Sequence, residues 1–366
     1  MLTAIRNRWR WFKGLLAVGW FLGFYYGDSL REYPLGVGIK MLAARLAFLV
    51  PLPFLLPDRR FLLNDQGGRM YQQLNSCPIY WDVALGTYEY WKTRLFSELV
   101  KEGMTILDIG ANEGYYSTLF ARLMHDKGRV LAFEPDPDNS QWLKKNISVN
   151  GYQCIELHEY ALSDREGDTT FYPGGGVGSL VHNPSPLAYF HGPSEPVTVR
   201  TRTLDNVLRE ANIKNVDLMK IDVEGADLLV LKGAKRTLET MNVRILMDVD
   251  VRGDERRELF DLLKSCGFSL YRIGKDLKPI SFANGSPIPS SLKPVKSPKV
   301  GHGSSNALSS AKSRFKSMLP PGIRSVLSVL IILLYRYLSI PVGWFRAPRE
   351  VREIYAVKSG DVRQSR

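Results

Sequence analysis

Three acidic residues, Asp108, Glu134 and Asp164, each come after one of three successive strand-like runs in the middle of the chain. The carboxyl ends of parallel strands meet at one edge of a sheet, where open α/β sheets bind their ligands. A carboxylate after the second strand accepts hydrogen bonds from a ribose diol. A carboxylate after the third strand is placed to accept one from an adenine amino group. The three acids in this order predict a nucleoside site.

A turn rich in small residues separates the first of these strands from the helix that follows it. The segment TILDIGANEGYYS, residues 105–117, places Gly110, Asn112 and Gly114 in that turn. Small residues let the backbone approach a ligand, and a helix start presents free N–H groups. The spacing differs from the G-x-G-x-x-G pattern of pyrophosphate sites, and the carboxylate of Asp108 would repel a phosphate. We therefore expect a cofactor without phosphate, S-adenosylmethionine (SAM).

Lys220, Asp222 and Glu224 alternate along the end of the fourth strand-like run. Alternate residues of an extended strand lie on the same side. A base accelerates attack by a hydroxyl, so we expect Asp222 or Glu224 to be the base or to position the hydroxyl, and Lys220 to orient or balance charge. In the alternative, the three only cap the next helix and hold the cofactor's ammonium group. No ligand spacing predicts a metal, although a divalent ion at Asp222 and Asp248 stays open.

A glycine- and proline-rich loop, residues 173–195, follows the third strand and contains His182, Tyr189 and His191. Its position predicts a lid over the acceptor. Because histidine titrates near neutral pH, either histidine is an alternative base.

Strand-like runs alternate with amphipathic stretches through the middle of the chain. The strand-like runs are 105–109, 130–133, 155–159, 216–221 and 243–249. The amphipathic stretches are 115–126, 139–150, 204–211, 227–240 and 255–265. This alternation predicts an α/β fold, with a mainly parallel sheet covered by helices on both faces. We place this domain at residues 61–281.

The excess of positive charge is confined to the two ends of the sequence. Residues 1–60 hold nine Lys/Arg and three Asp/Glu, a net charge of +6, and residues 275–366 hold sixteen and four, a net charge of +12. Residues 61–274 hold twenty-four and thirty, a net charge of −6. A domain that binds nucleic acid usually carries its positive charge itself, so no nucleic-acid partner is expected. Basic flanks suit an anionic membrane surface.

Both flanks contain short apolar runs. Residues 1–60 include GLLAVGWFLGFYY (14–26), and residues 321–366 include SVLSVLIILLYRYLSI (325–340), after a Ser/Pro/Lys linker at 282–320 that we expect to be disordered. The runs are short for a bilayer span, so we expect peripheral or monotopic helices on the cytoplasmic side of a membrane. A soluble cytoplasmic protein, whose helical flanks pack on the core, is the alternative. Three widely spaced cysteines suit a reducing compartment.

The strings LDIGANEGYYS, AFEPDP, ALSD, TRTLD and LMKIDVEGADLLVLKGA resemble the FkbM family of SAM-dependent methyltransferases. The likeness runs from about Gly86 to Val249. It implies a class I, Rossmann-like sheet of seven strands with one antiparallel strand, and O-methylation of a sugar or a secondary metabolite. Two positions depart from the family pattern: Asp227 replaces a common Glu, and the fifth strand ends in Asp248 and Asp250.

The resemblance also assigns roles to single residues. Glu134 would hold the ribose hydroxyls and Asp164 the adenine, while Tyr88 and Glu89 would close over the cofactor. The methionine and ribose end would be lined by Asp108, Gly110, Asn112 and Gly114. We expect a membrane-associated O-methyltransferase acting on a hydroxyl of a saccharide or lipid-linked glycan. The alternatives are a soluble secondary metabolite as acceptor, or a non-catalytic membrane adaptor that retains the fold. The sequence leaves the oligomeric state open.

Overall fold

The computed structural model describes residues 33–41, 60–74, 79–173, 178–180, 195–251, 253–274, 276–279 and 353–358. The chain divides into two units, one formed by Met1–Leu292 with Val351–Arg366 and the other by Lys293–Glu350. All elements named below belong to the first unit. The predicted apolar runs at 14–26 and 325–340 and the linker at 282–320 lie outside the described residues.

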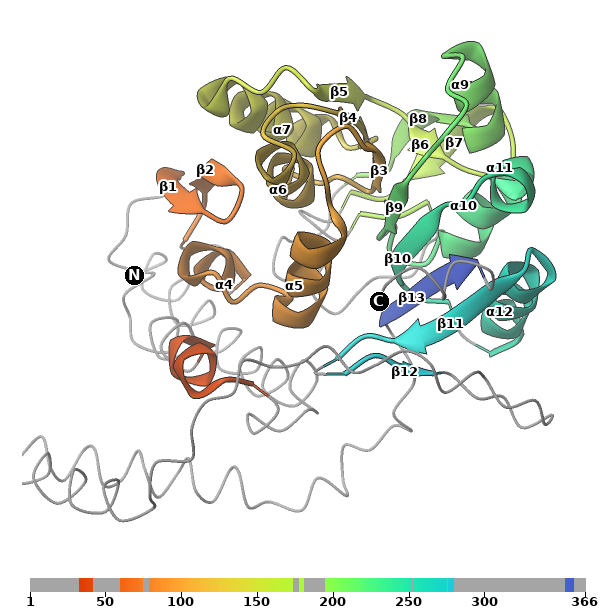
Figure 1. Ribbon diagram of the computed structural model, residues 1–366. Coiled ribbons are helices and arrows are strands. Elements are labelled where there is room, and N and C mark those ends of the chain that lie inside the picture. The colour runs from red at the N-terminus through yellow and green to blue at the C-terminus, as the bar shows by residue number, and fades with distance from the viewer. Residues whose placement is uncertain are drawn as a thin grey trace, which may run out of the picture. The chain divides into compact units, whose positions relative to one another are not determined.

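The core of the first unit is a sheet of eight strands in the order β12-β11-β13-β10-β9-β3-β4-β5 (Figure 1). In chain order they are β3 (Thr105–Ile109), β4 (Arg129–Phe133), β5 (Ile155–His158), β9 (Leu218–Ile221), β10 (Arg244–Asp248), β11 (Phe268–Arg272), β12 (Lys278–Pro279) and β13 (Glu353–Lys358). The five strands from β5 to β10 are parallel, and β13 is antiparallel to both of its neighbours. Apart from the two-residue β12, this is the mixed seven-stranded sheet with one antiparallel strand that the resemblance implies.

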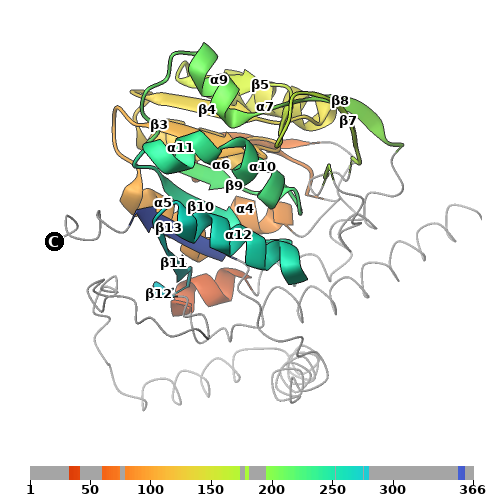
Figure 2. The same ribbon diagram turned by 90° about the vertical axis from the view of Figure 1, so that its right-hand side faces the viewer.

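Helices cover both faces of the sheet, as the alternation predicts (Figure 2). Successive residues of each central strand point to opposite faces of the sheet, so their side chains belong to two separate apolar clusters. One cluster contains Leu107 and Leu131 and packs against α9 (Leu204–Glu210), α10 (Asp227–Gly233), α11 (Lys235–Thr240) and α12 (Gly253–Ser265). The other contains Ile106 and Val130 and packs against α5 (Tyr90–Leu99) and α6 (Tyr115–Leu123). Asp108 therefore points toward the face that α5 and α6 cover.

The strand β13 comes from the far end of the sequence. It pairs with β10 on one side and β11 on the other, and its residues Ile354 to Val357 are buried. Lys358 anchors its end by donating to the carbonyl oxygens of Leu238 and Cys266. Sequence patterns assign this segment to a tail beyond a domain that ends at residue 281. The structure places it inside the sheet, so the domain includes residues on both sides of the 282–320 linker.

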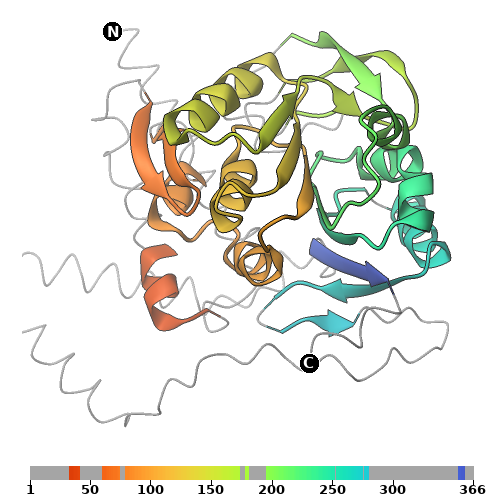
Figure 3. The ribbon, with the colours of Figure 1, turned by 45° about the horizontal axis from the view of Figure 1, so that its top comes forward.

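Two smaller sheets flank the main one (Figure 3). The hairpin of β1 (Phe61–Asp65) and β2 (Gly68–Gln72) lies beside α7 (Pro137–Asn150), and α4 (Ile79–Leu85) follows it. Asn146 and Asn150 of α7 hold the hairpin by accepting backbone hydrogen bonds from Tyr71 and Arg69. The second sheet has the order β6-β8-β7, formed by β6 (Ala161–Leu162), β7 (Gly167–Phe171) and β8 (Val197–Arg202). Within the described ranges, no helix combines the length and the apolar composition needed to cross a bilayer.

Candidate active site

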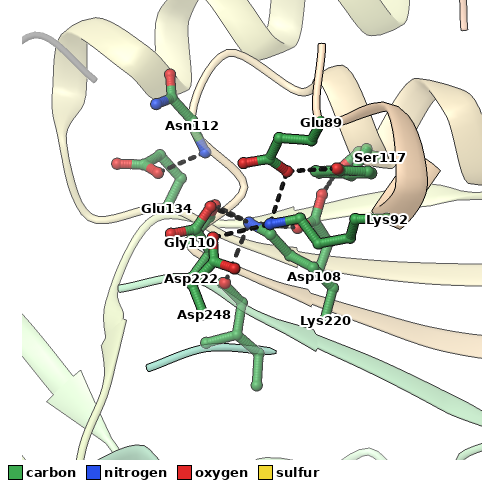
Figure 4. Close-up of polar contacts among 12 residues, drawn as sticks. Glu89, Lys92, Asp108, Gly110, Asn112, Ser117, Glu134, Lys220, Asp222 and Asp248 are labelled. Atoms are coloured by element: carbon green, nitrogen blue, oxygen red, sulfur yellow. Dashed lines mark hydrogen bonds and ion pairs between the residues drawn. The ribbon is translucent and has the colours of Figure 1, made fainter. Parts of the chain in front are cut away.

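Charged side chains converge at the carboxyl edge of β3, β9 and β10 (Figure 4). Lys220, on β9, is buried at the centre of this group. Its ammonium group donates to Gly110 O at 2.6 Å and lies 3.3 Å from Asp108 Oδ1 and 3.7 Å from Asp222 Oδ2. Burial alone would lower the pKa of Lys220, but the two carboxylates outweigh it and raise that pKa. Lys220 is therefore a fixed positive charge that ties the glycine turn to β9.

Asp108 lies beneath the turn rather than at its surface. Its side chain is fully buried, and Ser117 Oγ of α6 donates to Oδ2 at 2.6 Å. With Lys220 near the other oxygen, both oxygens of Asp108 face groups of the protein. Asp108 thus fixes Lys220 and the start of α6, and its predicted contact with a cofactor stays a prediction.

The turn itself needs glycine because the chain's own atoms are close. Gly110 has φ +76°, and a Cβ there would lie 1.9 Å from Asp222 O. Gly114 has φ +93°, and a Cβ there would lie 2.2 Å from a methyl carbon of Leu143. Asn112, between them, is also left-handed with φ +53°. The small residues were expected to let a ligand approach, whereas the structure shows that neighbouring protein atoms already exclude a side chain at Gly110 and Gly114.

Glu134 follows β4 and faces the same turn. Its carboxylate accepts from the backbone N–H of Asn112 at 2.7 Å and of Asp136 at 2.9 Å. Burial raises the pKa of Glu134 to about 7, and these two hydrogen bonds limit the rise. The side chain is thereby held in one orientation beside the turn, with a protonation state that changes near neutral pH.

Lys92 is a charged residue of the site that sequence reasoning missed. Its side chain is 1% exposed, and Nζ lies 2.6 Å from Glu89 Oε2 and 2.8 Å from Asp248 Oδ2. Glu89 begins α5 in a left-handed conformation, and Tyr116 donates to its carboxylate. The only sequence signal was the spacing of Glu89 and Lys92 by three residues on one helix turn, since Asp248 is far away in sequence.

Two further carboxyl groups, those of Glu224 and Asp227, follow β9 close to Asp222. Glu224 is left-handed with φ +50°, and burial together with Asp222 raises its pKa well above the usual value. Asp227 is fully buried, and burial together with Asp250 raises its pKa to about 8. Asp227 therefore favours its protonated form at neutral pH. The pKa of Glu224 is shifted in the same direction.

Of the remaining predicted residues, Tyr88 precedes Glu89 and packs on the tyrosines of α6, Asp164 follows β6, and three lie outside the described ranges. Tyr88 packs edge-on against Tyr115 at 5.0 Å between ring centroids. Asp164 is exposed just after β6, where it accepts from Ser163 Oγ at 3.2 Å, so its role with adenine stays a prediction. His182, Tyr189 and His191 of the predicted lid lie outside the described residues. Their role as a lid or base is untested.

The comparisons with known proteins agree with the strings that carry the resemblance. The family profile described as "Methyltransferase FkbM domain" matches residues 108–270. Residues 108–270 are thus similar to methyltransferase FkbM domains. This confirms the family resemblance, and the matched residues run from Asp108 in β3 to β11.

Several curated proteins are similar to this FkbM domain. The "2-O-methyltransferase NoeI" of Sinorhizobium fredii is 33% identical over 156 residues, covering 40% of this chain and 63% of that protein. The "Hexuronic acid methyltransferase AglP" of Haloferax volcanii is 29% identical over 153 residues, covering 42% and 59%. The "31-O-demethyl-FK506 methyltransferase FkbM" of Streptomyces tacrolimicus is 26% identical over 196 residues, covering 47% and 75%. The chain thus spans about 60% of the length of the first two relatives.

Among solved structures, the methyltransferase FkbM from Methylobacillus flagellatus aligns with a TM-score of 0.35 and 15% identity. The alignment covers 66% of this chain and 57% of that one.

Proposed function

We propose that the chain is a SAM-dependent methyltransferase that transfers a methyl group to a hydroxyl of a saccharide or lipid-linked glycan. The observation that carries the proposal is the glycine turn, Gly110 to Gly114, with the oriented carboxylate of Glu134 beside it and Asp222 at the end of the neighbouring strand. The names of two relatives support the acceptor class. One is named as a 2-O-methyltransferase, and the other is named as a methyltransferase of hexuronic acid.

The charge of the site suits the cofactor. Four carboxylates, those of Glu89, Asp108, Asp222 and Asp248, face two ammonium groups, those of Lys92 and Lys220. SAM supplies a methyl group made electrophilic by a positively charged sulfonium. Carboxylates that line a site favour such a cation over a phosphate-bearing nucleotide. Glu134 would accept hydrogen bonds from the two ribose hydroxyls. It can accept on both of its oxygens only when its carboxylate is ionised.

Asp222 is the residue we assign to the acceptor. Its side chain is 21% exposed, so a ligand has access to it. The ammonium group of Lys220 lies 3.7 Å from its Oδ2. In the proposed transfer the acceptor oxygen would bond to the methyl carbon as the sulfur–methyl bond breaks, with its electron pair left on the sulfur of S-adenosylhomocysteine. The hydroxyl proton would pass to Asp222. Holding the acceptor close to the methyl group accelerates the transfer. A base of this kind typically adds a further factor of about 10²–10⁴. Glu224 would position the hydroxyl.

The membrane part of the proposal rests on the sequence of the flanks. Residues 1–60 and 275–366 are basic and hold the apolar runs, which suits a peripheral place on the cytoplasmic side of a membrane. A soluble secondary metabolite is the second candidate acceptor, because one relative is named for 31-O-demethyl-FK506.

Mass spectrometry of glycans, lipids and small metabolites from cells with and without the gene tests the acceptor class. A glycan or glycolipid that gains the mass of one CH₂ group only when the wild-type gene is present supports the proposal. A gain confined to a soluble metabolite identifies the second candidate. If no extracted molecule changes while the purified protein binds SAM, the acceptor class is refuted and the cofactor assignment is retained.

A further inference from the structure

Three carboxylates from three separate elements meet on the acceptor side of the site. They belong to Glu89 at the start of α5, Asp222 after β9 and Asp248 at the end of β10. One oxygen of each lies within 4.8 Å of the others. A group of this size and composition is what a divalent cation such as Mg²⁺ or Mn²⁺ binds in proteins.

The ammonium group of Lys92 lies inside this group of carboxylates. It is 2.6 Å from Glu89 Oε2 and 2.8 Å from Asp248 Oδ2, which are hydrogen-bond distances between oppositely charged groups (Figure 4). The side chain is buried to 1% exposure and lies 5.6 Å from the centre of the Tyr116 ring. A buried ammonium so close to two of the three carboxylates occupies the position that a metal ion would need.

The carboxylates retain capacity to bind a cation. Asp248 Oδ1 is buried and has no hydrogen-bond partner among the described residues, although Oδ2 is bound to Lys92. An uncommitted buried carboxylate oxygen is costly unless a cation or donor is nearby. That oxygen is therefore available to a cation in a variant that lacks Lys92.

We propose that Lys92 is the resident cation of this carboxylate group and takes the place of a divalent metal ion. Lys92 is then a positioning residue, because it fixes Glu89 and Asp248 beside Asp222 and does not itself meet the acceptor. The proposal concerns the same site as the proposed methyl transfer, but its test does not depend on an acceptor or on turnover.

Titration of the full-length protein with Mn²⁺, followed by electron paramagnetic resonance and calorimetry at pH 8, tests this inference. Wild-type protein should bind no Mn²⁺ at this carboxylate group, so Asp248→Asn should leave its Mn²⁺ binding unchanged. Lys92→Ala should create a site for one Mn²⁺ per chain with at least tenfold higher affinity than wild type, and Mn²⁺ should raise its melting temperature. The double variant Lys92→Ala with Asp248→Asn should lose both effects. Lys92→Arg, which keeps a cation there, should behave as wild type.

Lys144→Ala is the matched control, because Lys144 makes an equally short ion pair of 2.6 Å with Glu159 on the exposed surface. It should gain no Mn²⁺ site. One Mn²⁺ bound to wild type and lost in Asp248→Asn would overturn the proposal, because the group would then be a metal site; this result is available even if Lys92→Ala does not fold. A folded Lys92→Ala without a Mn²⁺ site would overturn it too. SAM titration of the same wild-type sample reports separately on the proposed function.

Discussion

The protonation of Glu134 should make cofactor affinity depend on pH. Its pKa of about 7 arises because the carboxylate is buried and receives only two strong backbone hydrogen bonds. Only the ionised form keeps, on both oxygens, a lone pair beyond those used by the two backbone hydrogen bonds, and so can accept from both ribose hydroxyls. With a pKa of about 7, the ionised fraction rises from about 0.1 at pH 6 to about 0.9 at pH 8, so this residue alone should strengthen SAM binding about tenfold across that range.

Isothermal titration of SAM at several pH values, with wild type and Glu134→Gln, measures this effect. The amino group of the ligand titrates in both experiments, so the ratio of the two affinities isolates Glu134. The ratio should grow about tenfold from pH 6 to pH 8, and Glu134→Gln should bind more weakly at pH 8 by about 1.5–3 kcal/mol, the contribution of hydrogen bonds to a charged group. Glu159→Gln, at an exposed ion pair, should match wild type. An affinity ratio that does not change with pH would refute the reasoning.

Three further results are expected. Because burial raises the pKa of Glu134 from its ordinary 4.5 to about 7, stability is lost as pH rises from about 4.5 to about 7. Glu134→Gln should therefore raise the unfolding free energy by up to about 3 kcal/mol at pH 8 and not at pH 4, as measured by urea unfolding at both pH values. Gly110→Ala should lower unfolding free energy by more than about 3 kcal/mol, since its Cβ would overlap Asp222 O, whereas Gly225→Ala, also left-handed but with open space, should cost about 1 kcal/mol; equal costs would contradict the close approach. Ile354→Asp should unfold the domain by circular dichroism while Ile354→Val costs about 1 kcal/mol, and a folded Ile354→Asp would show that β13 is dispensable.

The central strands and helices could be predicted because their apolar residues repeat locally. The runs at 105–109 and 130–133 coincide with β3 and β4 to within a residue. The predicted helix at 227–240 is two helices, α10 and α11, which meet at Ala234. The side chain of Asp205 accepts from the backbone N–H groups of Arg236 and Thr237 and caps α11 from a distant part of the chain. Periodicity does not report such a break, because its cause is a tertiary contact.

Features that depend on contacts between distant parts of the chain could not be predicted from local sequence patterns. β13 is only six residues long, and nothing local shows that it enters the sheet between β10 and β11. Lys92 meets Asp248 across 156 positions, so the pair has no sequence spacing to recognise. The glycines of the turn were predicted correctly as a turn, but the need for them comes from Asp222 and Leu143, which the sequence places far away.

Calorimetric titration of the full-length protein with SAM, S-adenosylhomocysteine and ATP tests the central claim most directly. The account predicts that SAM and S-adenosylhomocysteine each bind one per chain, that Glu134→Ala weakens both, and that ATP does not compete. A protein that binds neither adenosyl ligand, or that binds ATP in their place with the same dependence on Glu134, would contradict it.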